Sequence, residues 1–354
     1  MMRAVQISLK GKGKTSPDPL AGALLVKGTK IIAERWRKTY DDPYVFELLR
    51  AAGPLSENAV LYMTMEPRHH YEDGVQETDM IVRGGIKSVV IGLKDPHPLY
   101  YGKGVTALRQ LGIGVKTGIL KGPVESSNAP YITYIREKRP YLTAKSAQTI
   151  DGKIATAGGH SQWITSEESR RFARKARGDF DAIMVGINTV LKDDPRLDPV
   201  PLKKKFLKIV VDSHLKIPPR AKVLKDPWRC LVATTKQADR KKVERLRKNG
   251  VKVVICPSKD KQVRLQWLFE ELGKNEVVSV LLEGGGRLAG GAFKERLVDR
   301  VHIYIAPKIA GDARALNAVD GLHPRTIDDI IKLNHLNVTA QGPDLLVQAD
   351  VAYL

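Results

Sequence analysis

Cysteine is nearly absent from this chain of 354 residues, in which only Cys230 and Cys256 occur. Two thiols cannot form a disulfide framework and are too few for a metal site built of cysteines, so we expect a protein of the reducing cytoplasm. No apolar run approaches the roughly 18 residues that a membrane span requires, and the first residues lack the apolar stretch of a secretory signal. We therefore expect neither membrane insertion nor export.

Acidic residues are fewer than basic ones: the chain has 39 aspartates and glutamates and 59 lysines and arginines. Its formal net charge is +20. Such a charge raises the question of nucleic-acid binding, since basic surfaces attract phosphate backbones. However, the basic residues are spread along the chain, and the clusters at 203–205 and 240–248 lack the interleaved aromatic residues of a single-strand platform. We expect no nucleic-acid partner and interpret these clusters as solvated faces.

Short apolar runs rich in valine and isoleucine alternate with helical patterns along the whole chain. Examples are SVVIGL, DAIMVGI, KIVVDS and VVSVLLEGG, with amphipathic segments such as SEESRRFARKAR between them. This alternation is typical of βαβ units over a largely parallel sheet, and the length suits two domains. The polar stretch KGPVESSNAPYITYIREKRP separates two such series, so we predict an α/β protein with domains at 1–138 and 139–354.

The N-terminal half carries a specific resemblance. Its segments TSPDPLAGALLVKG, LYMTMEPRHHYEDG and IKSVVIGLKDPHPLYYGKGVTALRQLGIGVKTGIL, within residues 15–120, resemble in order and spacing the cytidine-deaminase-like domain of the bifunctional riboflavin-biosynthesis deaminase/reductase family. Such deaminases use zinc, held by one histidine and two cysteines, to generate hydroxide, and a glutamate to move protons. The family's Pro-His-Ala-Glu stretch corresponds here to residues 43–46, PYVF, and its two cysteines correspond to Arg68 and Glu77.

These replacements predict a degenerate, inactive deaminase domain that binds no zinc. Arg68 brings a fixed positive charge to a place where the resemblance puts a cation. Glu47 could be a displaced general base and the histidines at 69–70 replacement ligands, but a carboxylate without a metal generates no hydroxide, and adjacent histidines rarely converge on one ion. Two asparagines that the family presents to the pyrimidine are also replaced, by Asp18 and His97.

From Arg139 onward the chain resembles the reductase domain of the same family, whose fold is that of dihydrofolate reductase. The segments that carry the resemblance include RPYLTAKSAQTIDGKIAT, GGHSQWITSEESRRFARKARGDFDAIMVGINTVLKDDPRL and VLLEGGGRLAGGAFKERLVDRVHIYIAPKIAG. The resemblance implies NADPH-dependent reduction of 5-amino-6-(5-phosphoribosylamino)uracil to its 5-phosphoribitylamino form, with hydride delivered to C1′ of the opened sugar. It also implies a homodimer formed through the reductase domain.

A cofactor crevice is expected where the apolar run VVSVLLE meets the glycines of EGGGRLAGG and a following helix, AFKERLVD. Glycines there let backbone amides approach a pyrophosphate at a helix N-terminus. A plain tight turn explains the run equally well, because no acidic residue follows at the Rossmann spacing. Without the resemblance, Trp163 would suit the core and Asp193 a turn or cap. The resemblance assigns cofactor contacts to Ala147, Trp163, Thr189, Asp193, Ser213, Gly285, Gly286, Gly290 and Gly291.

The resemblance assigns substrate contacts to Ser161, Arg177, Leu197 and Glu283. Arg177 suits a sugar phosphate, because its planar fork can bind two oxygens at once, and Glu283 could hold sugar hydroxyls. Lys145 could protonate the sugar oxygen or the imine as hydride arrives, so we predict Lys145, Asp193 and Glu283 as catalytic residues. Alternatives remain: a surface helix arginine for Arg177, an amide-binding carboxylate for Glu283 and a solvent-facing lysine for Lys145.

One departure concerns the substrate-binding loop. Where the family has a substrate-binding arginine after Asp-Asp-Pro, this chain has Val200, and Arg196 or Lys203 could replace it. Two other interpretations stay open. A bifunctional deaminase/reductase would contain one zinc per chain, whereas a non-catalytic nucleotide- or RNA-binding protein would bind RNA in a salt-dependent way and leave NADPH unoxidised.

Overall fold

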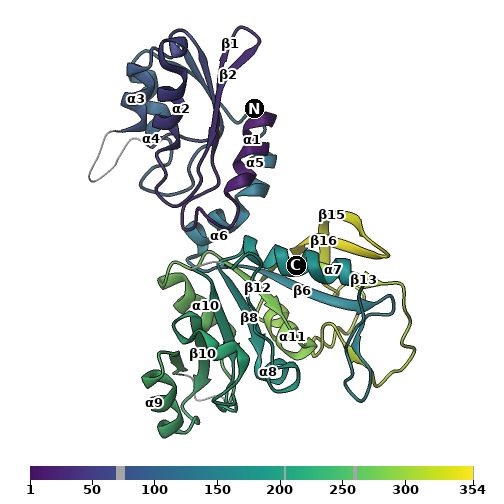
Figure 1. The fold of residues 1–354 in the computed structure, drawn as a ribbon. Helices are drawn as coiled ribbons and strands as arrows, with labels where there is room; N and C mark the ends of the chain where they lie inside the picture. The colour runs from purple at the N-terminus through teal and green to yellow at the C-terminus, as the bar shows by residue number, and fades with distance from the viewer. Residues whose placement is uncertain (69–75, 203–204, 258–260, 354) are drawn as a thin grey trace. The chain divides into compact units, whose positions relative to one another are not determined.

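The computed structural model describes residues 1–68, 76–202, 205–257 and 261–353. The chain divides into two compact units, Met1–Lys138 and Arg139–Leu354 (Figure 1). Within the described ranges, no helix combines the length and the apolar character needed to cross a membrane.

The N-terminal unit is built on a five-stranded sheet with the order β2-β1-β3-β4-β5. In this sheet β1 pairs with β2 and β3 in antiparallel fashion, whereas β3, β4 and β5 are parallel. The strands are β1 (Gly22–Lys27), β2 (Lys30–Trp36), β3 (Val60–Met65), β4 (Ser88–Leu93) and β5 (Gly114–Thr117). The helices are α1 (Met2–Ser8), α2 (Tyr44–Ala52), α3 (Glu77–Arg83), α4 (Lys103–Gln110), α5 (Lys121–Ser127) and α6 (Ala129–Glu137).

Alternating residues along β1 give this sheet two buried faces, as expected for a strand whose side chains point to opposite sides. Ala23 and Leu25 belong to the main core with α2, α3 and α4, while Leu24 packs with Ala4 and Ile7 of α1. Figure 1 shows α2, α3 and α4 on one side of the sheet and α1 and α5 on the other. The helices therefore cover both faces.

The polar stretch at 121–140, predicted as the boundary between the domains, is helical over most of its length. It forms α5 and α6, and both helices belong to the N-terminal unit. Val124, Tyr131 and Ile135 are buried, and the last two lie one helical turn apart on the same face of α6. The units divide at the end of this stretch, and its few apolar residues are enough to dock two short helices on the N-terminal unit.

The C-terminal unit is built on a nine-stranded sheet with the order β11-β10-β9-β8-β12-β6-β13-β16-β15. Neighbouring strands from β11 to β13 are parallel, and β16 and β15 add an antiparallel hairpin at one edge. Its strands are β6 (Tyr141–Thr149), β8 (Ala182–Gly186), β9 (Leu207–Val211), β10 (Cys230–Thr235), β11 (Lys252–Cys256), β12 (Ser279–Glu283), β13 (Val298–Ala306), β15 (Lys332–Gln341) and β16 (Asp344–Ala352). Its helices are α7 (Glu167–Ala176), α8 (Ile187–Asp193), α9 (Arg240–Lys248), α10 (Leu265–Lys274) and α11 (Gly286–Lys294), and a small separate ribbon pairs β7 (Lys153–Ala155) with β14 (Leu316–Asn317).

The central strands of this sheet are buried on both faces. Along β8, Ala182 and Met184 face one core cluster while Ile183 and Val185 face another. Strands in this situation are continuous apolar runs rather than alternating ones, which explains why the sequence pattern predicted them well. The carboxyl ends of β6, β8, β9 and β12 lie at one edge of the sheet, where ligands bind in open α/β folds.

Candidate active site

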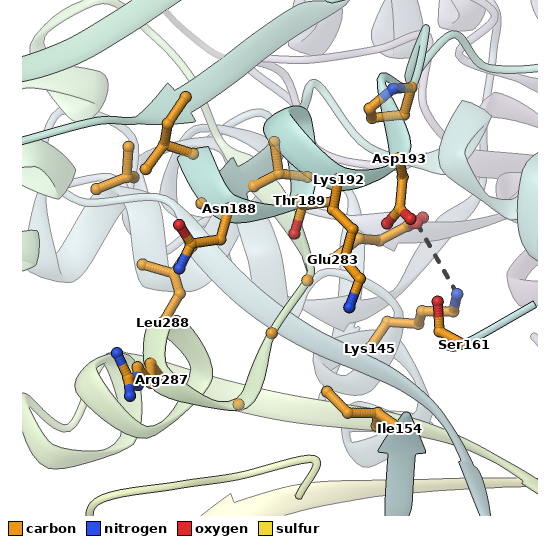
Figure 2. Close-up of a pocket in the computed structure, with 18 of the residues that line it drawn as sticks. Lys145, Ile154, Ser161, Asn188, Thr189, Lys192, Asp193, Glu283, Arg287 and Leu288 are labelled. Carbon is orange, nitrogen blue, oxygen red and sulfur yellow. Dashed lines mark ion pairs between the residues drawn. The ribbon is translucent and has the colours of Figure 1, made fainter. Parts of the chain in front are cut away.

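A cavity of about 1320 Å³ lies at this edge of the C-terminal sheet. Its walls come from the ends of β6, β8, β9 and β12, from the helices α7, α8 and α11, and from the segments 154–165 and 316–320. Figure 2 shows Lys145, Thr189, Lys192 and Glu283 converging on its interior from different elements. Parallel strands bring these side chains together although they are distant in sequence.

A charged group of three residues, Lys145, Arg177 and Glu283, lies at the base of this cavity. The guanidinium of Arg177 donates from Nε and Nη2 to the two carboxylate oxygens of Glu283, both at 2.9 Å. Lys145 Nζ lies 3.8 Å from Glu283 Oε2, the ion pair drawn in Figure 2, and 5.5 Å from the ring centre of Tyr304. Parallel pairing of β6 with β12 sets Lys145 directly beside Glu283. We call these three residues the Glu283 triad.

The charges of the Glu283 triad fix the ionisation of its carboxylate. Burial alone would raise the pKa of Glu283, but the positive charges of Arg177 and Lys145 and the hydrogen bonds from Arg177 outweigh it and lower this pKa to about 2. The pKa of Tyr304 is raised, first by burial and then by the nearby Glu283 carboxylate. At neutral pH the cavity therefore presents an ionised carboxylate held between two cations.

The glycine-rich run after β12 begins a helix earlier than predicted. Gly284, with φ of 148°, makes the turn, and α11 starts at Gly286, so the expected helix at 292–299 is in fact the end of α11 and the start of β13. A Cβ on Gly286 or on Gly290 would lie only 2.3 Å or 1.7 Å from a backbone oxygen of segment 317–320. These two glycines allow close packing of α11 on that segment.

The N-terminus of α11 faces the cavity without a side-chain cap. The first backbone amides of a helix lack partners within it and attract anions. Gly285, Gly286 and Gly291 line the cavity, whereas Gly290 does not. Gly290 is therefore not part of the proposed site, because the packing of α11 explains why a glycine is needed there.

Every other residue predicted to contact cofactor or substrate, or to act in catalysis, lines this one cavity. Trp163 is 61% exposed, so the alternative of a core residue was wrong. Asp193 caps no helix through its side chain, whereas the adjacent Asp194 binds Lys222. The lining includes Lys145, Ala147, Ser161, Trp163, Arg177, Thr189, Asp193, Leu197, Ser213, Glu283, Gly285, Gly286 and Gly291.

A buried ionic cluster holds the loop that follows α8. Lys208, fully buried, lies 3.2 Å from Asp198 and donates to the carbonyl of Arg196, while Arg229 lies 3.5 Å from Asp198. Leu197, at φ of 60°, is buried and forms part of the cavity wall. Arg177 Nη1 donates at 3.4 Å to the Asp198 carbonyl, so this loop and the Glu283 triad are directly connected.

Several cavity residues were missed by sequence reasoning. Arg170 and Arg174 lie on the same face of α7 as Arg177, and their helical spacing was a signal that could have identified them. Asn317 and Asp320 come from a segment without regular structure apart from the short β14, and the sequence gives no sign that it returns to the cavity.

In the N-terminal unit, the positions that correspond to zinc ligands hold a cluster of buried charges. Arg68 Nη2 lies 2.5 Å from Asp18 Oδ1, and Arg37 Nη1 lies 3.6 Å from Asp18 Oδ2. Glu77 accepts a hydrogen bond from the Arg68 backbone amide at 2.8 Å. The guanidinium of Arg37 lies over the ring of Tyr44, 5.1 Å from its centre. We call Asp18, Arg37, Arg68 and Glu77 the Asp18 cluster.

Glu47, the possible displaced general base, lies on the surface, and two other acidic residues of this unit, Glu66 and Asp95, bind backbone amides or a hydroxyl. Glu47 pairs with Arg50 at 2.6 Å on the surface of α2, and Phe46 is exposed. Glu66 accepts hydrogen bonds from three backbone amides, and Asp95 accepts one from the Tyr131 hydroxyl. The histidines at 69–70 lie outside the described residues. Within the described residues, no three His, Cys, Asp or Glu side chains are grouped so as to hold a metal ion.

Comparison with known proteins gives consistent relatives. The family model of the RibD C-terminal domain matches residues 140–347. The riboflavin biosynthesis protein RibD of Actinobacillus pleuropneumoniae is 38% identical over 352 residues, which is 98% of this chain and 93% of that protein. RibD of Aquifex aeolicus is also 38% identical, over 98% of this chain and 96% of that protein.

Solved structures agree along nearly the full length. RibD of Acinetobacter baumannii superposes with a TM-score of 0.89 at 26% identity, covering 99% of this chain and 98% of that chain. The diaminohydroxyphosphoribosylaminopyrimidine deaminase/5-amino-6-(5-phosphoribosylamino)uracil reductase of Thermotoga maritima superposes with a TM-score of 0.83 at 28% identity, covering 99% and 97%. The predicted fold class is confirmed, with a deaminase-like N-terminal part and a dihydrofolate-reductase-like C-terminal part. The chain therefore belongs to the RibD family of riboflavin biosynthesis proteins and contains the reductase domain of that family.

Proposed function

We propose that this chain catalyses the NADPH-dependent reduction of 5-amino-6-(5-phosphoribosylamino)uracil to the 5-phosphoribitylamino product, and that residues 139–354 form the reductase domain. The observation that carries the proposal is the Glu283 triad at the base of a cavity of about 1320 Å³. Sites for one small molecule usually measure about 300–1,000 Å³. The larger volume suits a dinucleotide beside a second ligand.

The lining residues fit a dinucleotide. The uncapped amides at the start of α11, with Gly285, Gly286 and Gly291, suit a pyrophosphate. When bound, NADPH supplies the hydride. The hydroxyls and apolar surfaces around these glycines would contact the rest of the cofactor, and they belong to Ala147, Trp163, Thr189, Asp193 and Ser213.

The Glu283 triad would position the sugar and supply a proton. In the reduction, C1′ of the opened sugar accepts a hydride while the adjacent imine nitrogen accepts a proton, which Lys145 Nζ holds at the base of the cavity. Glu283 would bind sugar hydroxyls and stabilise the Lys145 ammonium, and Arg177 holds Glu283 through two hydrogen bonds. Ser161 and Leu197 would complete the substrate side of the cavity.

We further propose that residues 1–138 form a deaminase-like domain without deaminase activity. The donor set does not fit zinc, because a tyrosine, an arginine and a glutamate take the positions that correspond to one histidine and two cysteines. The Asp18 cluster supports this proposal, since its two arginines pair with the Asp18 carboxylate, and burial raises the pKa of Glu77 and so favours its neutral form. Another enzyme would then supply the deaminated substrate.

A second copy of this chain and a cytoplasmic location complete the proposal. Every residue of β15 except the last is exposed, and Ile327 and Leu336 are 82% and 62% exposed. An exposed edge strand with apolar side chains on it and beside it suits burial in a homodimer.

The proposed location is the cytoplasm, because it offers NADPH and keeps the two free, buried cysteines reduced.

The experiment uses the purified full chain with NADPH and either the deaminated or the undeaminated phosphoribosylamino-pyrimidine. We expect NADPH oxidation with the deaminated substrate, no ammonia release from the other, and no stoichiometric zinc by elemental analysis. Replacing Lys145 by Met should lower kcat by about 10² to 10⁴-fold, whereas Lys175→Met, on the exposed surface of α7 outside the cavity, should not. Zinc together with ammonia release would establish the bifunctional alternative, which the name of the Thermotoga maritima relative suggests.

A further inference from the structure

Three arginines of α7 and its C-cap reach the cavity. Arg170, Arg174 and Arg177 follow one another at intervals of four and three residues, which places them along one face of the helix, and all three line the cavity. Arg171 points about a quarter turn away from this row around the helix axis, lies outside the cavity lining and is 3.9 Å from Glu167. The cavity therefore receives a row of guanidinium groups from α7 and the residue that follows it.

Two of these three guanidinium groups are already engaged. Arg177 donates from Nε and Nη2 to Glu283 and from Nη1 to the Asp198 carbonyl, which uses every nitrogen of its fork. Arg170 lies 4.3 Å from the ring centre of Trp163 and donates to the Thr165 carbonyl at 2.6 Å.

Arg174 differs from both neighbours. Within the part of the chain that the structure describes, its guanidinium has no carboxylate or carbonyl partner, and it is exposed to the cavity. An exposed guanidinium without an acceptor in the protein is available to bind an anionic ligand.

The loop that lacks the expected arginine lies against Arg174. The backbone amide of Val200 donates to the Arg174 carbonyl at 3.4 Å, so position 200 is adjacent to this turn of α7. The Val200 side chain does not line the cavity, and Arg196 of the same loop pairs with Asp198 at 3.1 Å, also outside the lining. Lys203 lies outside the described residues. An arginine at 174 can thus reach the space that an arginine at 200 would serve.

We propose that Arg174 binds the phosphate of the sugar-phosphate substrate in this chain, in place of the arginine missing at Val200. This inference rests on the proposed reductase function and assigns phosphate recognition to a residue other than Arg177, whose fork holds Glu283. A guanidinium can donate two parallel hydrogen bonds to a phosphate, which gives both affinity and orientation. Arg174 is a substrate-binding residue and takes no part in the proton transfer.

The test compares Arg174→Gln with Arg171→Gln, which removes the same charge from α7 at a residue outside the cavity lining. With the phosphorylated uracil substrate, Arg174→Gln should raise KM by about 10- to 100-fold with little change in kcat, because one charge-assisted contact is lost from binding. Arg171→Gln should match the wild type. Adding Val200→Arg to Arg174→Gln should restore much of the lost affinity.

The dephosphorylated substrate separates phosphate recognition from a general structural effect. Wild type and Arg174→Gln should use it equally poorly, and a loss of equal size with both substrates would overturn the proposal, as would an unchanged KM in Arg174→Gln. If the wild type reduces neither substrate, the proposed function fails. Calorimetric titration with ribose 5-phosphate then tests the phosphate site independently of the reductase activity. Binding that weakens in Arg174→Gln but not in Arg171→Gln supports the phosphate site. Equal binding by the wild type and both variants refutes it.

Discussion

Replacing Glu283 by Gln should destabilise the C-terminal unit by about 3 kcal/mol at pH 7. The pKa of Glu283 is about 2 against an ordinary value of 4.5, and one pKa unit corresponds to about 1.4 kcal/mol. The charged carboxylate therefore stabilises the folded unit by about that amount relative to a neutral group. Glutamine keeps the shape but leaves Arg177 and Lys145 with no negative charge between them.

The pH dependence gives the sharper test of this reasoning. A carboxylate whose pKa is lowered by folding contributes stability above its unfolded pKa and loses it as the pH falls through the folded value. The difference between wild type and Glu283→Gln should therefore be constant from pH 7 down to about pH 5.5 and shrink as the pH approaches 2.

Hydrogen exchange in a urea series, measured on peptides of β12 and β6, would give the free energy of unfolding of the C-terminal unit alone. Glu271→Gln is the matched control, because Glu271 pairs with Lys274 on the exposed face of α10, where such pairs contribute about 0–1 kcal/mol. A Glu283→Gln variant as stable as wild type at pH 7, or a difference that does not change between pH 7 and pH 3, would refute the reasoning.

Two further substitutions test packing and charge in the two units. Gly290→Ala would place a methyl group 1.7 Å from the Asp320 carbonyl oxygen and should destabilise the C-terminal unit by about 1–3 kcal/mol, whereas Gly291→Ala, with its nearest atom at 3.7 Å, should be tolerated. Equal stability of the two variants in urea unfolding would contradict the close packing. Asp18→Asn removes a carboxylate from between the buried Arg37 and the partly buried Arg68 and should cost about 3–5 kcal/mol, measured by exchange on β1 and β3 peptides. Glu34→Gln, which breaks a pair between partly exposed side chains, should cost far less, and a similar loss in both would show that the Asp18 cluster is unimportant for stability.

The sequence predicted the sheets better than the segments between them. Runs such as DAIMVGI and VVSVLLE are buried on both faces, so their apolar character alone identifies strands. The start of α11 was placed too late because glycines normally end or avoid helices. At Gly286 and Gly290, contact with segment 317–320 overrides that preference, and contacts with distant residues leave no local pattern.

The candidate site was predicted by resemblance more than by pattern. Residue types and spacing alone did not pair Arg177 with Glu283, because the two lie 106 residues apart and meet only through the strand order. Arg174 was overlooked for a different reason. The sequence does not show which arginines of α7 face the cavity until the orientation of the helix is known. For the Asp18 cluster, the sequence predicted only that the zinc ligands are lost. The ion pairs of Asp18 with Arg37 and Arg68 became visible only in the structure.

The insertion of β12 between β8 and β6 has a consequence for biogenesis. During synthesis the ribosome releases β6 and β8 well before β12, so the two flanking strands must either wait apart or pair and then separate again. A nascent chain that stops short of residue 283 has neither the central strand nor the anion that joins Lys145 to Arg177. Truncated products are therefore expected to be inert and prone to degradation rather than partially competent.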